Sequence, residues 1–111
     1  MPIGSHCLTY SPVDFTQEKV VTWTSDTSAE LDRTFDAVNT HFVSQQIPVI
    51  VGEWGVEDGS KAVDSERAKY VAAFKAKAKA LGIGCIYWYD LIDRNTYAWK
   101  YPLTGAAVAG N

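Results

Sequence analysis

Residues 47–55 read IPVIVGEWG, and this stretch decides the fold. Val and Ile follow one another without polar alternation, which is typical of a parallel strand buried on both faces. The run ends at Glu53, which stands between Gly52 and Gly55. In barrels that alternate parallel strands with helices, catalytic groups stand at the C-terminal ends of the strands. Glu53 is therefore the strongest candidate for a catalytic residue in this chain.

The bulk composition is that of one ordinary globular domain. The chain has 111 residues, of which 47% are hydrophobic and 21% charged, and its formal net charge is −3. This balance offers no basic patch for nucleic acid or for an anionic membrane surface. The start, MPIGSHCL, has neither the charged region nor the apolar core of a signal peptide, and no run is long enough to span a membrane. The composition thus argues against nucleic-acid and membrane partners and leaves the cellular location open.

The aromatic residues and the two cysteines give weaker indications of function. Four Trp, six Tyr and four Phe are present; most are expected to fill the core, although aromatic rings near strand ends also stack on sugars. Cys7 and Cys85 lie in apolar, strand-like runs without metal-ligand spacing. Buried thiols are the favoured state, and a disulfide between the two remains the alternative.

The first half of the chain predicts two strands and a helix. A short apolar strand is expected over residues 3–10, followed by a long polar and aromatic loop over residues 11–27. Thr27 and Glu30 have the spacing of a capping box, which predicts a helix from there to about residue 44. Its apolar face is expected to carry Leu31, Phe35, Val38 and Phe42. The second strand is expected over residues 48–53.

The second half predicts a further helix, a third strand and a short last helix. Asp64 is the expected N-cap of the second helix, and Gly82 its end. A strand over residues 83–89 leads to a turn at residues 93–96 and an Ala-rich tail that can form the last helix. Strands that alternate with helices imply an α/β fold with a parallel sheet.

Four pieces of the sequence together resemble glycoside hydrolase family 5, the cellulases. They are Tyr10-Ser11-Pro12, IPVIVGEWG at 47–55, AKALGIGCIYW at 78–88 and LIDRNTYAW at 91–99. The family is built on a (β/α)8 barrel, and the resemblance runs along nearly all of the chain but only to the last three βα units. Residues 1–111 are thus expected to be one C-terminal portion of a barrel, with three parallel strands and flanking helices.

The resemblance assigns roles to several residues. Glu53 matches the nucleophile, Tyr10 the tyrosine that hydrogen-bonds it, and Trp88 the tryptophan that floors the sugar site. A tyrosine hydroxyl keeps such a carboxylate ionised and aimed. The family has a histidine two residues before the matched tyrosine, where this chain has Leu8. Either His6 takes that role through a two-residue displacement, or the role is lost.

Trp54 is a further candidate for sugar contact. The chemistry implied needs only carboxylates and water, so no metal and no cofactor are expected.

The acid/base of the family is not matched. A retaining glycosidase needs two carboxylates about 5–5.5 Å apart, and the family's acid/base follows an Asn in an Asn-Glu-Pro motif. The sequence has no Asn-Glu pair. Asp90, supplied by a partner chain, is one candidate acid, and Glu57 and Asp58 are others. The glycine-rich loop that the family has after Trp88-Tyr89-Asp90 is also missing.

Three strands cannot close a barrel, which needs eight. The sheet face expected to carry Val49 and Val51 would then lie open, with unpaired edges. We therefore expect a homo-oligomer that hides this face. Two functions follow: an endo-β-1,4-glucanase that cleaves β-glucan with retention, or a catalytically inactive partial barrel that self-associates and at most binds sugar weakly.

Overall fold

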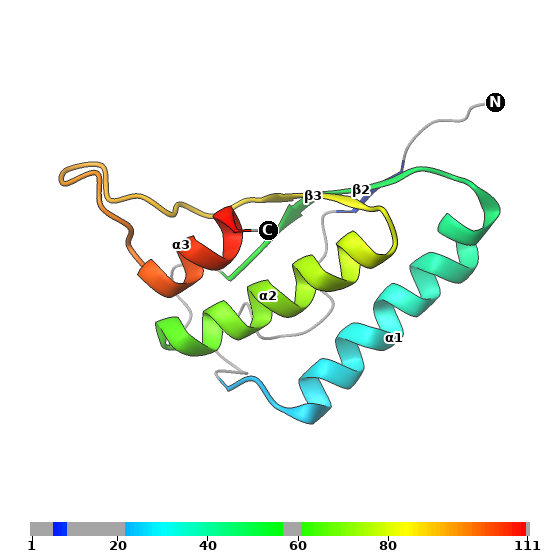
Figure 1. Cartoon of the computed structure of the whole chain (residues 1–111), viewed down its shortest axis with the longest axis horizontal. Helices are drawn as coiled ribbons and strands as arrows, with labels where there is room; N and C mark the ends of the chain where they lie inside the picture. Colours follow the sequence, from blue (N-terminus) through cyan, green and yellow to red (C-terminus); the bar gives the residue numbers. More distant parts are fainter. Residues whose placement is uncertain (1–5, 9–21, 57–60, 111) are drawn as a thin grey trace.

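The structure is a computed structural model that describes residues 6–8, 22–56 and 61–110. Strands and helices alternate along these residues, as the sequence predicts (Figure 1). The elements are β1 (His6–Leu8), α1 (Ser25–His41), the short 3-10 helix η2 (Val43–Gln45), β2 (Val49–Trp54), α2 (Asp64–Ala80), β3 (Gly84–Tyr87) and α3 (Pro102–Ala109). None of the helices described is both long and apolar enough to cross a membrane.

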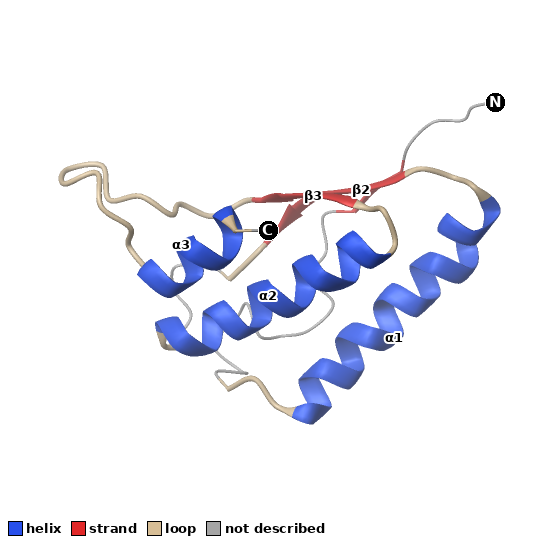
Figure 2. Ribbon diagram, in the orientation of Figure 1, coloured by secondary structure: helices blue, strands red, loops and turns tan. Residues whose placement is uncertain are grey.

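The three strands form one parallel sheet in the order β1-β2-β3. Strand order follows chain order, so α1 connects β1 to β2 and α2 connects β2 to β3, while α3 follows the last strand. The helices lie together on one side of the sheet (Figure 2). The other side, which we call the open face, is covered by no described element. The predicted α/β class and parallel sheet are therefore confirmed.

The core lies between the sheet and the helices. Val49 and Val51 of β2 are buried there, and Ile50 between them is 41% exposed. The expectation that Val49 and Val51 line the open face is wrong, because that face carries Ile50 and, from β3, Ile86, which is 58% exposed. The helices contribute Leu31, Phe35, Val38, Tyr70, Val71, Phe74 and Ala78 to this core.

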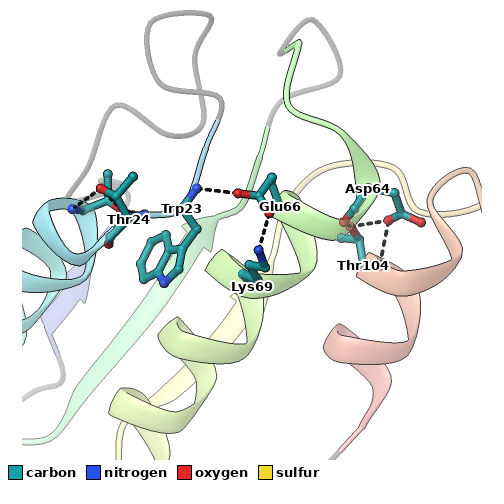
Figure 3. A network of polar contacts seen from close by, with 7 residues as sticks. Trp23, Thr24, Asp64, Glu66, Lys69 and Thr104 are labelled. Carbon is teal, nitrogen blue, oxygen red and sulfur yellow. Dashed lines mark hydrogen bonds and ion pairs between the residues drawn. The ribbon is translucent and has the colours of Figure 1, made fainter.

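Helix α1 begins earlier than predicted. The capping box joins Thr24 and Thr27, whose hydroxyls each accept a hydrogen bond from the other's backbone N–H, at 2.8 Å and 3.3 Å. The Thr27–Glu30 box expected from sequence is therefore wrong. Residue 23, just before the cap, is tied to α2, because its backbone N–H donates to Glu66 at 2.9 Å (Figure 3).

Asp64 caps a different helix from the one predicted. Helix α2 begins at Asp64 itself, after an N-cap at Val63 that has no side-chain hydrogen bond. The Asp64 carboxylate instead accepts hydrogen bonds from the backbone N–H of Leu103 and of Thr104, both at 2.9 Å, and from the Thr104 hydroxyl at 2.8 Å (Figure 3). These groups lie in the first turn of α3, where N–H donors lack helical partners. Asp64 thus caps α3 across the helix–helix interface.

Lys75 holds the other end of α3. Its ammonium group donates to the carbonyls of Ala107 at 3.1 Å and Val108 at 2.7 Å, and also to that of Gly110. A carboxylate at the N-terminus and an ammonium at the C-terminus both suit the helix dipole. Since Asp64 and Lys75 both belong to α2, this one helix fixes both ends of α3.

Gly82 and the turn at residues 93–96 both lie where the sequence predicts them. Gly82 has a φ of 69° directly after the C-cap of α2, which confirms it as the end of that helix. The turn at 93–96 forms around Asp93, whose carboxylate accepts from the N–H of Asn95 and of Thr96 at 2.8 and 3.1 Å. After this turn the chain runs back antiparallel to the residues before it, with Trp99 opposite Ile92. The Trp99 ring also packs on Gly105 of α3, so closely that a side chain at residue 105 would collide with the ring.

The strand register settles the cysteine question. Cys7 pairs with Ile50 and Cys85 with Val51, so the two cysteines flank β2 on opposite sides. Two strand spacings put their Cα atoms about 9–10 Å apart, beyond the reach of a disulfide. Cys85 is a free thiol whose pKa is raised by burial.

The Asp64 cap predicts a pH-dependent stability. Burial raises the pKa of Asp64, but the hydrogen bonds from Leu103 and Thr104 and the charge of Arg67 outweigh it and leave the pKa below its ordinary value. The stabilisation is therefore complete above about pH 4 and is lost as the pH falls further. We expect Asp64→Ala to lower the free energy of unfolding by about 1 kcal/mol at pH 7.

Urea unfolding followed by circular dichroism measures this difference. It should shrink between pH 4 and pH 2.5, while Asp36→Ala on the exposed face of α1 changes stability little at either pH. A difference that is the same at both pH values would contradict a charged cap.

Candidate functional site

Glu53 lies at the C-terminal end of β2, next to a β-bulge. The register between β2 and β3 shifts between Val51 and Trp54. Val51 and Trp54 are both buried against the helices, although two residues rather than one separate them. The extra residue reverses the alternation of side chains. Glu53, directly before Trp54, therefore belongs to the open face, where it is half-buried.

Trp88 follows the end of β3 and belongs to the same face as Glu53. Its backbone N–H donates to the carbonyl of Trp54 at 2.9 Å, which extends the pairing of β2 and β3 past Tyr87. Tyr87 packs toward the helices, so Trp88 turns to the open face, and its side chain is 60% exposed. Alternation thus places a carboxylate and an accessible indole on the same face at the carboxyl edge of the sheet. This pair can supply a nucleophile and a flat apolar platform.

Trp54 does not belong to this pair. Its ring stacks on Phe74 with centroids 4.0 Å apart and meets the edge of Tyr87 at 5.3 Å. It is 4% exposed. The prediction that Trp54 contacts sugar is therefore wrong: the bulge that directs Glu53 to the open face directs Trp54 into the core.

The backbone of His6 pairs with Val49, four residues before Glu53 on β2. At the rise of a strand this is about 13 Å along the sheet. The role of His6 at the site stays a prediction.

Of the remaining candidate site residues, the structure describes only Asp90. Asp90 follows the exposed Trp88 and forms an exposed ion pair with Arg94 at 3.5 Å. Tyr10, Glu57 and Asp58 lie outside the described residues. In the part of the chain that is described, no group of three or more His, Cys, Asp or Glu could hold a metal ion.

Sequence reasoning missed the groups that hold the end of β2. The Tyr87 hydroxyl accepts from the N–H of Val56 at 3.3 Å and donates to its carbonyl at 3.4 Å. Arg67, 1% exposed, donates to the carbonyls of Ala62 at 2.8 Å and Val56 at 3.5 Å. Its guanidinium also lies over the ring of Tyr101, 4.0 Å from the centroid.

A signal for both residues is present in the sequence. Arg67 precedes Val71, Phe74 and Ala78 at helical spacing, which places it on the buried face of α2. Tyr87 alternates with Trp88, so one of the two must turn to the helices.

A family model described as "Cellulase (glycosyl hydrolase family 5)" matches residues 6–90, more than half of the chain. The chain belongs to glycosyl hydrolase family 5. This confirms the family predicted from the GEWG strand end and the motifs around it.

Two curated relatives of this family 5 chain show how much of an enzyme it matches. Endoglucanase B of Neocallimastix patriciarum is 33% identical over 86 residues, which cover 67% of this chain and 18% of the relative. Endoglucanase A of Ruminococcus albus is 27% identical over 126 residues, covering 98% of this chain and 34% of the relative. The chain thus spans about a third or less of the length of these relatives.

Solved structures agree on the fold. A glycoside hydrolase 5 lichenase from Caldicellulosiruptor sp. F32, in complex with cellotetraose, superposes with a TM-score of 0.79 at 25% identity, covering 94% of this chain and 33% of the lichenase. A broad specificity endoglucanase from Ruminococcus champanellensis with bound cellotriose gives 0.79 at 21% identity, covering 96% and 34%. The described α/β unit is therefore similar to part of these enzymes.

Proposed function

We propose that this family 5 chain carries the nucleophile side of a retaining glycosidase site that cleaves β-1,4-glucan, with Glu53 as the nucleophile. One observation carries the proposal: Glu53 and the exposed Trp88 share the open face at the carboxyl edge of the sheet. Family membership and the endoglucanase relatives support the substrate class.

The proposed reaction has two steps. A Glu53 carboxylate oxygen attacks the anomeric carbon of a sugar that lies on the Trp88 ring. The bond from that carbon to the glycosidic oxygen breaks, and the departing oxygen takes a proton from a general acid. Water then attacks the same carbon and loses a proton to the same group, which releases Glu53 and retains the configuration. By resemblance, Tyr10 donates a hydrogen bond to Glu53.

The second carboxylate, the general acid, is proposed to come from another polypeptide chain. It must lie about 5–5.5 Å from Glu53. Asp90 of a second copy is one candidate, because it is exposed at the same edge and is paired only loosely with Arg94. Glu57 and Asp58 are the others.

We further propose that the sheet is part of a (β/α)8 barrel whose open face is covered by self-association. Parallel sheets in proteins are covered on both faces. Here the open face exposes Ile50, Ile86 and Trp88. The superposition on a third of larger family 5 enzymes supports a partial barrel.

A second candidate function is an inactive partial barrel that self-associates and binds sugar weakly. This candidate needs no acid/base from outside residues 1–111, which contain no Asn-Glu pair. The two candidates differ in whether the protein turns over β-1,4-glucan.

A fluorinated substrate tests the nucleophile alone. In 2,4-dinitrophenyl 2-deoxy-2-fluoro-β-cellobioside the dinitrophenolate leaves without a proton, so no general acid is needed. Glu53 should form a stable ester with the fluorosugar, located by peptide mass spectrometry, and Glu53→Gln should take no label. Glu30→Gln, exposed on α1, should label like the wild type.

A wild-type chain that takes no label, or a Glu53→Gln variant that does, refutes Glu53 as the nucleophile. Reducing-sugar release from carboxymethyl-cellulose by the labelling-competent chain then separates an enzyme from an inactive barrel.

The platform role of Trp88 predicts a binding defect. Trp88→Ala should raise the probe concentration for half-maximal labelling by about fivefold to tenfold, because stacking on the ring is lost. Tyr97→Ala, exposed at the hairpin of residues 91–100, serves as the aromatic control and should leave this concentration unchanged. Equal effects of the two variants would contradict a platform at residue 88.

The covered open face predicts a dimer or larger assembly. Light scattering at micromolar concentration should report it, and Ile86→Glu should shift it toward monomer, because a charge is costly to bury. Val63→Glu is the matched control, since Val63 is 62% exposed, similar to Ile86, but is the N-cap of α2 on the helix side of the sheet. A soluble wild-type monomer would refute self-association.

A further inference from the structure

The backbone that follows Glu53 is held from the neighbouring strand by one side chain, Tyr87. The Tyr87 hydroxyl makes two hydrogen bonds to Val56, one with its N–H at 3.3 Å and one with its carbonyl at 3.4 Å. The Tyr87 ring also meets the ring of Trp54 nearly at right angles, with centroids 5.3 Å apart. Tyr87 therefore contacts residues on both sides of Gly55, within three positions of Glu53.

Gly55 lies beneath the tyrosine rings. Its φ of 145° is a conformation that other residues rarely adopt. A Cβ atom there would lie 2.9 Å from Cε2 and Cζ of Tyr87 and 2.9 Å from Cδ2 of Tyr89. The rings thus pack directly on the backbone at residue 55. A side chain at this position would separate the end of β2 from β3.

Val56 is fixed from a second direction as well. Its carbonyl accepts a hydrogen bond from Nη1 of Arg67 at 3.5 Å as well as one from the Tyr87 hydroxyl. Val56 itself is fully buried. Residues 54–56 consequently have contacts to β3 on one side and to α2 on the other. The peptide that bears Glu53 is the last part of β2 before this anchored segment.

We infer that Tyr87 is a positioning residue for Glu53. Its hydroxyl fixes Val56 and its ring closes on Gly55, and together they hold the bulge that turns the Glu53 carboxylate to the open face. Tyr87 packs on the helix side of the sheet and touches no substrate. The inference rests on the proposed role of Glu53, because small displacements of a reacting group are costly only where it reacts.

Tyr87→Phe tests the inference, since it removes the hydroxyl and keeps the ring. With the fluorinated cellobioside as probe, the labelling rate constant at saturation should fall about tenfold. The half-saturating concentration should stay unchanged, because Trp88 still supplies the platform. Amide hydrogen exchange at Val56 should become about tenfold faster, because its N–H has lost its acceptor.

Two glycine variants separate positioning from stability. Gly55→Ala should reduce labelling more strongly than Tyr87→Phe, because its methyl group meets both tyrosine rings. Gly82→Ala is the matched control: Gly82 also has a positive φ, but a Cβ there has no neighbour within 4 Å. It should lower stability and leave both the labelling rate constant and exchange at Val56 unchanged.

The outcomes are distinct for the two proposals. A labelled wild type with unchanged labelling or unchanged Val56 exchange in Tyr87→Phe overturns the inference. A wild type that takes no label refutes the role of Glu53 and, with it, any positioning for that role. Equal labelling losses in Gly55→Ala and Gly82→Ala would also overturn it, since general destabilisation would then explain the effect.

Discussion

In β2, Val51 and Trp54 both pack against the helices, and the bulge between them makes this possible. Without the extra residue, alternation would bury the Glu53 carboxylate under the helices and leave the Trp54 ring outside. Burial of an unpaired carboxylate is costly, whereas burial of an indole against Phe74 is favourable. The irregularity thus buries the Trp54 ring in the core and leaves Glu53 on the open face. The placement of Glu53 on the same face as Trp88 depends on it.

The groups around the bulge form a continuous support. Tyr87 and Arg67 reach Val56 from β3 and from α2, and Arg67 continues to Tyr101 ahead of α3. Asp64 then binds the first turn of α3. The strand end that carries Glu53 is therefore connected through buried contacts to the last helix. An arrangement of this kind is expected where a side chain must be held in one orientation.

Much of the fold could be predicted from the sequence because the apolar periodicities are regular. The spacing of Leu31, Phe35 and Val38 places α1, and IPVIVGEWG places β2 and the end at which chemistry is expected. The strand end in IPVIVGEWG points to Glu53, the resemblance to family 5 assigns a role to Trp88, and the family indicated by these motifs is the one the chain matches. These signals are local, and the local structure follows them.

The features that could not be predicted depend on contacts distant in sequence or on a choice between equivalent residues. Val49, Ile50 and Val51 are all apolar, so their pattern does not tell which face meets the helices. Thr24 and Thr27 can both cap a helix, and the reciprocal hydrogen bond between them decides. The position of Asp64 before an apolar helix predicts that it caps that helix, yet its hydrogen-bond partners lie about forty residues away. Nothing in the residues GEWG predicts the bulge that buries Trp54.

The way α2 holds α3 also has a consequence for how the chain acquires its structure. An isolated helix of eight residues does not persist in water, since nucleation costs more than so few hydrogen bonds return. Asp64 and Lys75 supply partners at its two ends only after α2 exists. The last segment of the chain is accordingly expected to order late, templated on a surface that has already formed.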